Sequence, residues 1–323
     1  MKTGIYFMKL QTHIPLEEQE HNQLDYHSKI MMLGSCFVEH IGEKLEYFKF
    51  QNSRNPFGIL FHPLAIESFI TNVVNEKVYA HSDLFFHNEQ WQTYEAHSKL
   101  SNTSKDNVLE TLNTQIRKTH RSLKDASHLI ITLGTSWVYR HIETDVIVAN
   151  CHKVPQKQFL KELLSVSDII ESVEGFLSVL KTINPKLSVI FTVSPVRHLK
   201  DGCIENQQSK SHLITAIHQI IDPRKQVYYF PSYELMMDEL RDYRFYAEDM
   251  IHPNTTAINY IWEKFQDVWI SNLAKPTMKE VDTLQKGLLH KPFNPSSKAY
   301  ALFVSQLKSQ KEQLCERFTH MAF

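Results

Sequence analysis

The stretch Ile30–Phe48, IMMLGSCFVEHIGEKLEYF, joins a run of apolar residues to a helical pattern through a single glycine. Ile30–Leu33 are continuously apolar, as in a strand that is buried on both faces. After Gly34, apolar residues recur at i, i+4, i+8 and i+11, the spacing of one helix face: Phe37, Ile41, Leu45 and Phe48. The stretch therefore predicts a buried strand, a tight turn and a helix.

The same alternation continues along the chain. Further apolar runs that suit buried strands are residues 129–133, 189–193 and 227–230, and helical patterns cover about 108–123, 168–183, 209–221 and 254–273. Strands that alternate with amphipathic helices predict an α/β fold with a parallel central sheet, helices on both sides and right-handed crossovers. In such sheets the active site lies beyond the carboxyl ends of the strands.

Two segments depart from this alternation. Residues 55–105 have weak periodicity and many aromatic and histidine residues, so we expect an irregular insertion near the active site. After Pro276 the chain becomes polar and Lys-rich, and residues 299–303 lead into a terminal helix. These features predict a main domain over residues 1–275 and a C-terminal helical appendage over 276–323.

Composition narrows the function classes. An apolar share of 42% and a charged share of 22% over 323 residues are those of a globular protein, which excludes a disordered or fibrous chain. The chain has 35 Lys and Arg residues against 36 Asp and Glu residues. Because these charges nearly balance, no broad basic surface for nucleic acid or an anionic membrane is expected. Met1–Leu16 lacks the apolar core of an export signal, and no segment has the roughly 20 apolar residues of a membrane span, so we expect a cytoplasmic protein.

Ser35 is the first candidate catalytic residue. It follows the strand and the glycine turn, which places its hydroxyl at a helix N-terminus. Unpaired backbone N–H groups and a partial positive charge at that position favour a developing alkoxide and an oxyanion beside it. The alternative is that Ser35 is simply the N-cap of the helix.

Asp249-Met250-Ile251-His252-Pro253 is the second candidate. The three-residue spacing lets the Asp249 carboxylate reach the Nδ1 proton of His252 while Nε2 stays free to act as a base. A serine hydroxyl is a poor nucleophile at neutral pH without such a base. The alternative is a solvated loop without a catalytic role.

Together the motifs resemble the ordered blocks of the SGNH (GDSL-type) hydrolases: Gly34-Ser35, Gly58, Gly134-Thr135-Ser136 and Asp249-x-x-His252. The chain is more similar still to the GSCFA family, named for a Gly-Ser-Cys-Phe-Ala motif, because residues 34–38 read Gly-Ser-Cys-Phe-Val. Other stretches similar to that family are 55–58, 97–98, 132–137, 150–153, 194–198 and 241–253. The resemblance covers about residues 28–270.

The resemblance implies a three-layer, flavodoxin-like SGNH hydrolase fold. It also implies that Ser35 is the nucleophile, His252 the base and Asp249 the residue that orients the imidazole. We expect hydrolysis or transfer of an acyl ester, such as an O-acetyl group on a carbohydrate, without a cofactor or metal. The expected partner is a small-molecule or carbohydrate ester, with no nucleic acid and no membrane, and the oligomeric state stays open.

One departure from the SGNH pattern concerns the oxyanion hole. These enzymes usually carry an asparagine in the third block, where this chain has Ser136. The oxyanion hole is therefore expected to use the backbone N–H groups of Ser35 and Gly58, with the Ser136 hydroxyl as a further donor. Because the loss of one donor costs about 10²–10³ in rate, the alternative is a catalytically weak or inactive binding or scaffold protein that retains the fold.

Five polar residues in the family-like stretches are candidates for lining the substrate pocket, and each could equally be a hydrogen-bonded structural residue: His97, Asn150, His152, Arg197 and Asn206.

Two other chemistries are alternatives to a serine nucleophile. Cys36 adjoins Ser35, and a helix N-terminus lowers a thiol pKa, but successive side chains point about 100° apart, so only one of the two faces His252. Cys151, His152, His97 and His252 are residue types that bind zinc. Their spacing matches no zinc signature, and no metal site is predicted.

Overall fold

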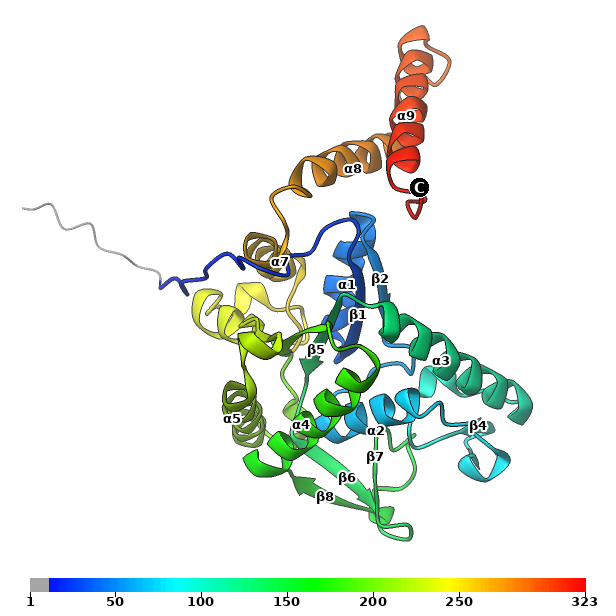
Figure 1. The fold of residues 1–323 in the computed structure, drawn as a ribbon, viewed down its shortest axis with the longest axis vertical. Helices are drawn as coiled ribbons and strands as arrows, with labels where there is room; N and C mark the ends of the chain where they lie inside the picture. Colours follow the sequence, from blue (N-terminus) through cyan, green and yellow to red (C-terminus); the bar gives the residue numbers. More distant parts are fainter. Residues whose placement is uncertain (1–11) are drawn as a thin grey trace, which may run out of the picture.

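The computed structural model describes residues 12–323, so the prediction for Met1–Leu16 concerns a segment that lies mostly outside the described residues. Its centre is a five-stranded sheet in which every pairing is parallel (Figure 1). In spatial order the strands are β10 (Val227–Tyr229), β9 (Ser188–Val193), β5 (His128–Leu133), β1 (Lys29–Gly34) and β2 (Gln51–Arg54). Numbered along the chain, this order is 2-1-3-4-5, that of flavodoxin-like folds, in which ligands bind where the order reverses, between β1 and β5.

Helices cover both faces of this sheet. The α2 (Pro63–Val74), α3 (Lys105–Asp125), α4 (Val166–Ile183) and α5 (Cys203–Ile220) helices share one apolar cluster, and α1 (Phe37–Tyr47) and α7 (Thr255–Trp269) share the other. Strand β1 contributes Met31 and Leu33 to the first cluster and Ile30 and Met32 to the second. This alternation across the sheet confirms the predicted three-layer α/β fold and its strands buried on both faces.

The prediction of an irregular segment over residues 55–105 is wrong for α2, a helix of 12 residues. Of its side chains only Ser68 is exposed, and Ile66, Phe69 and Ile70 are almost completely buried. Because most of the helix surface is covered, the contrast between an apolar and a polar face that identifies a helix in a sequence is lost. The segment also holds η1 (His81–Asp83), the antiparallel pair β3 (Phe85–His87) and β4 (Gln90–Gln92), and η2 (Ser98–Leu100).

A second, antiparallel sheet follows β5. It consists of β7 (Val146–Val148), β6 (Trp137–His141) and β8 (Phe159–Leu163), with η3 (Gln156–Gln158) before β8. Short helical turns connect the later elements: η4 (Leu199–Asp201), η5 (Pro223–Lys225), α6 (Ser232–Glu234), η6 (Leu235–Glu239) and η7 (Tyr243–Phe245).

The C-terminal helices α8 (Lys275–Leu288) and α9 (Lys298–Arg317) extend from the body of the molecule (Figure 1). The tail is therefore helical, as predicted, although Pro276 lies in the first turn of α8. Met278 and Val281 of α8 belong to the same apolar cluster as Trp262 of α7. The domain boundary at residue 275 stays a prediction. Within residues 12–323, no helix combines the length and apolar character that crossing a bilayer requires.

Candidate active site

Ser35 lies at the carboxyl edge of the sheet, where the strand order reverses. The strand β1 ends at Gly34, opposite Thr132 of β5. Gly34 has φ +134°, and a Cβ on it would lie 2.1 Å from the Thr132 carbonyl oxygen, so only glycine fits. Ser35 follows with its Oγ accepting a 3.4 Å hydrogen bond from the Phe37 N–H. Its residue surface is only 1% exposed.

Asp249 and His252 form a preassembled pair in the loop before α7. The His252 Nδ1 lies 2.7 Å from the Asp249 Oδ2, and Oδ1 accepts hydrogen bonds from the backbone N–H groups of Ile251 (2.9 Å) and His252 (3.0 Å). These hydrogen bonds, from the His252 backbone, its imidazole and then Ile251, lower the pKa of Asp249 to about 2. The carboxylate is therefore ionised at neutral pH and orients the imidazole with Nε2 directed away from it.

The pair lies at the same edge of the sheet as Ser35. The Arg197 N–H, in the segment after β9, donates to the Ile251 carbonyl (3.3 Å). His252 is also close enough to His198 for its charge to lower the pKa of His198. Among residues 12–323, however, no hydrogen bond joins the Ser35 Oγ to the His252 Nε2. The two halves of the predicted triad share an edge without a hydrogen bond between them.

Ser136 does not face this edge in the way the sequence suggests. Its hydroxyl donates to the Ser209 carbonyl (3.1 Å), its N–H donates to the Ser209 Oγ (2.7 Å), and the residue is fully buried. The side chain thus fixes α5 to the end of β5. Its only hydroxyl proton is therefore used in this conformation, and a role as donor to an oxyanion stays a prediction.

The two expected backbone donors are also engaged. The Ser35 N–H donates to the Thr132 carbonyl at 3.0 Å, and the Gly58 N–H donates to the Asn55 carbonyl at 2.8 Å. Neither N–H is therefore free for an oxyanion in this conformation. The Asn55 side chain in turn accepts from the Gly34 N–H at 2.9 Å and thus ties the Gly58 turn to the end of β1.

Three of the five residues predicted to line the substrate pocket stabilise the segment over residues 55–105. His97 packs against Gly58, and its Nδ1 accepts from the Lys99 N–H. His152 is buried, with Nε2 2.7 Å from the Thr93 carbonyl, and the Asn150 Oδ1 accepts from its N–H. Burial lowers the pKa of both histidines. These contacts are structural, and a role in substrate binding remains a prediction for all three.

The other two candidates lie in or near the loop after β9. The Arg197 guanidinium stacks on the Tyr246 ring at 4.5 Å, beside the Asp249–His252 loop. Asn206 is buried and accepts the His198 N–H through its Oδ1 (2.8 Å). Arg197 therefore borders the candidate site, whereas Asn206 fixes the backbone of its neighbour.

Neither Cys36 as an alternative nucleophile nor a metal site is supported by the contacts of the described residues. Burial raises the pKa of Cys36, which keeps the thiol protonated and unreactive at neutral pH. Within the described range, no cluster of three or more His, Cys, Asp or Glu side chains is arranged to hold a metal ion.

Lys210 is not among the residues predicted from the sequence, and it lies beneath the strand ends. Its side chain is fully buried, and Nζ donates to the carbonyl oxygens of Gly134 (2.6 Å) and Ser194 (2.8 Å), just beyond β5 and β9. Burial lowers its pKa to about 7. The sequence carries a signal for this burial, because Lys210 lies on the same helix face as Leu213 and Ile217, three and seven residues later.

His198 was also missed as a site residue, although the sequence motif 194–198 contains it. Its Nε2 is buried without a hydrogen-bond partner in the described part of the chain. Burial, and then the charges of Lys210 and His252, lower its pKa to about 3, so the ring is neutral at physiological pH.

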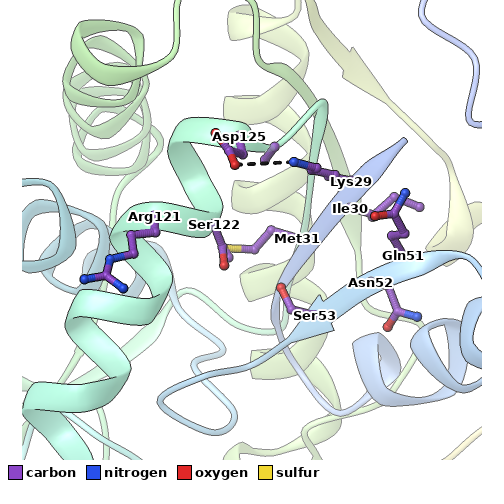
Figure 2. Close-up of a pocket in the computed structure, with 10 residues that line it drawn as sticks. Lys29, Ile30, Met31, Gln51, Asn52, Ser53, Arg121, Ser122 and Asp125 are labelled. Carbon is purple, nitrogen blue, oxygen red and sulfur yellow. Dashed lines mark hydrogen bonds and ion pairs between the residues drawn. The ribbon is translucent and has the colours of Figure 1, made fainter. Parts of the chain in front are cut away.

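A separate pocket lies at the opposite end of β1 from Ser35 (Figure 2). It lies between the start of β1, the edge strand β2 and the end of α3, and an ion pair between Lys29 and Asp125 (3.3 Å) borders it. Because Lys29 begins the strand that Gly34 ends, this pocket is separated from Ser35 by the length of β1.

The family model described as "GSCFA family" matches residues 29–265, and the model "GSCFA domain protein, C-terminal domain" matches 281–323. Among solved structures, the chain is similar to a carbohydrate esterase family 3 protein from Talaromyces cellulolyticus (9% identity, TM-score 0.36), with 79% of this chain and 99% of that chain covered.

A mutant acetyl esterase with an acetate ion shows 10% identity and a TM-score of 0.36, with 80% of this chain and 99% of that chain covered. A Clostridium thermocellum family 3 carbohydrate esterase shows 9% and 0.35, with 80% and 98% covered. The comparison with curated proteins found no match.

Proposed function

Because the chain belongs to the GSCFA family, we propose that it is a serine-dependent ester hydrolase or acyltransferase with Ser35 as its nucleophile. One observation carries the proposal: the 2.7 Å pair between the Asp249 carboxylate and the His252 Nδ1, at the same sheet edge as Ser35. An imidazole held in this way has its other nitrogen available as a general base.

The reaction has two steps. The Ser35 Oγ attacks the ester carbonyl carbon while the His252 Nε2 takes the hydroxyl proton, and Asp249 stabilises the imidazolium that forms. Collapse of the tetrahedral intermediate breaks the ester bond, and His252 returns the proton to the departing alcohol. Water or a second alcohol then attacks the acyl-serine by the same route, which gives hydrolysis or transfer.

The acyl group is proposed to be small, such as acetyl, and the alcohol to be a carbohydrate. Ser35 is only 1% exposed, which leaves little space around its Oγ for a long acyl chain. The loop that carries His252 is more open, with side-chain exposures of 43% for His252 and 46% for Asp249. A bulky alcohol fits better on that open side than beside Ser35.

A fluorophosphonate probe tests the nucleophile. The Ser35 Oγ would displace fluoride from phosphorus, its proton passing to His252, and intact-mass spectrometry would show one adduct on the wild-type protein and none on Ser35→Ala. An adduct that persists on Ser35→Ala would mean that another residue is the nucleophile. Turnover of p-nitrophenyl esters of increasing acyl length and of acetylated sugars then tests the substrate class.

A second candidate function is a binding or scaffold protein that retains the hydrolase fold. Two observations favour it: the low exposure of Ser35, and the lack of a Ser35–His252 hydrogen bond within residues 12–323. This function predicts that no ester is turned over faster by the wild type than by Ser35→Ala. It also predicts that acetylated sugars still bind to both proteins in isothermal titration calorimetry.

A further inference from the structure

A tetrahedral intermediate on Ser35 needs hydrogen-bond donors that the expected residues do not supply in this conformation. The Ser136 hydroxyl and the N–H groups of Ser35 and Gly58 each donate to another atom of the chain. A preorganised donor is worth about 10²–10³ in rate. An efficient enzyme therefore requires a polar group at this edge whose N–H or O–H is unused.

His198 is the candidate for such a group. Its Nε2 is buried and without a partner in the described part of the chain, and it lies 3.2 Å from the position that a Cβ on Gly134 would take. Gly134 follows β5, the strand beside β1, and its own N–H is bonded to the Phe61 carbonyl. The His198 Nε2 is thus directed at the end of the strand next to the one that presents Ser35.

The surroundings of His198 come from several segments that are distant in the sequence. The Phe61 ring, just after the Gly58 turn, lies 5.9 Å from its ring. Lys210 and His252 are close enough for their charges to act on it. Asn206 holds its backbone N–H at 2.8 Å. The ring is therefore fixed from several sides while one ring nitrogen has no partner, which is costly for a buried polar group unless a ligand pairs with it.

We propose that the His198 Nε2–H donates a hydrogen bond to the oxyanion that forms when Ser35 attacks the ester, in place of the asparagine of other SGNH hydrolases. The inference rests on the proposed ester chemistry. A neutral imidazole has a single N–H, and the nearby Lys210 opposes protonation of the ring. His198 is thus assigned a different role from His252: donor to the oxyanion, not proton acceptor from the serine.

A simpler role for His198 would be as a packing group against Phe61. The two roles differ in what they require, since packing needs a ring and oxyanion stabilisation needs an N–H. His198→Phe keeps a ring of similar size without the N–H, whereas His198→Gln keeps an N–H donor without the ring. His81→Phe is the matched control, because its side chain is 63% exposed.

The experiment uses the full chain and measures kcat and KM for p-nitrophenyl acetate together with the rate of Ser35 labelling by the fluorophosphonate. We expect His198→Phe to lower kcat and the labelling rate by about 10²–10³, with KM little changed. His198→Gln should recover part of the loss, and His81→Phe should match the wild type. Thermal unfolding followed by near-UV circular dichroism shows whether each variant is folded.

Two outcomes would overturn the assignment. His198→Phe could react as fast as the wild type, or folded His198→Gln could lose as much rate as His198→Phe. A failure of the proposed function looks different, because the wild-type protein would then be neither labelled at Ser35 nor active on any ester, whatever residue occupies position 198.

Discussion

The Lys210 ammonium lies directly beneath the end of β5 and donates a 2.6 Å hydrogen bond to the carbonyl oxygen of Gly134. Its second hydrogen bond, to Ser194, connects the end of β5 to the end of β9. Its fully buried side chain forms no ion pair with a carboxylate in the described residues. A buried ammonium held by two carbonyl dipoles, with its Nζ 5.7 Å from the centre of the Tyr233 ring, raises the local positive potential at the edge where an oxyanion would form.

Lys210 should make stability depend on pH in the alkaline range. In the unfolded chain its amine keeps its proton up to about pH 10.5, whereas burial lowers the folded-state pKa to about 7. Between these values the unfolded state binds more protons, so the free energy of unfolding rises with pH, by at most about 1.4 kcal/mol per pH unit. That contribution is complete above pH 10.5 and is lost as the pH falls towards 7.

Urea unfolding of the wild type and Lys210→Met at several pH values between 7 and 10 measures this effect. The difference in unfolding free energy between the two should change in favour of the wild type as the pH rises. Lys308→Met, at a side chain that is 77% exposed, serves as the control and should show no such trend. A difference that stays constant with pH would show that Lys210 has an ordinary pKa.

Asp249→Asn should lower kcat without unfolding the protein. The asparagine cannot stabilise the imidazolium and favours the wrong tautomer of His252, so we expect a loss within the range of about 10²–10⁴ that general acid–base catalysis supplies. Asp242→Asn is a matched control, since Asp242 also accepts from a backbone N–H and pairs with Arg244 nearby. An equal loss in both variants would assign the effect to loop structure and not to His252.

The sequence was sufficient to predict four of the five strands of the central sheet and the contact between Asp249 and His252. Strands buried on both faces need continuous apolar runs, and the run that ends at Gly34 is β1, where the strand order reverses. The Asp249-x-x-His252 spacing likewise places carboxylate and imidazole in contact through a single turn of loop. Each of these features depends on a few residues adjacent in the chain.

Features that depend on distant contacts were not predictable. The edge strand β2 has the sequence QNSR, which carries no apolar signal because the strand is only partly covered. Lys210 shares a helix face with Leu213 and Ile217, but only the position of α5 under the strand ends shows that its ammonium bonds the Gly134 carbonyl. Ser136 occupies an asparagine position of the SGNH pattern, and only its contact with Ser209, 73 residues later, shows that it fixes α5.

Ser136→Ala should therefore reduce stability and not activity. Its hydroxyl bonds the Ser209 carbonyl in a fully buried environment, and the loss of that bond should cost about 0.5–1.5 kcal/mol in urea unfolding. Ser211→Ala removes a solvent-exposed hydroxyl on α5, the helix that carries Ser209, and it should cost less. If Ser136→Ala lowered kcat and left stability unchanged, the hydroxyl would belong to the oxyanion hole after all.

Gly58→Ala should destabilise the turn that carries the second family-like block. Gly58 has φ +72°, and a Cβ added to it would lie 2.4 Å from the Cβ of His97. Both the left-handed backbone and the close contact oppose a side chain, so we expect a loss of more than about 1 kcal/mol in the free energy of unfolding, measured with urea.

Gly175→Ala is the control with the opposite expectation, because Gly175 lies inside α4 and the atom nearest to an added Cβ would be a Glu67 oxygen at 3.6 Å. There alanine should be neutral or stabilising, by up to about 1 kcal/mol. His97→Ala would leave the clash with Gly58→Ala in place, since alanine keeps the Cβ. If the double variant were as stable as His97→Ala alone, the imidazole and not the backbone would be the source of the strain.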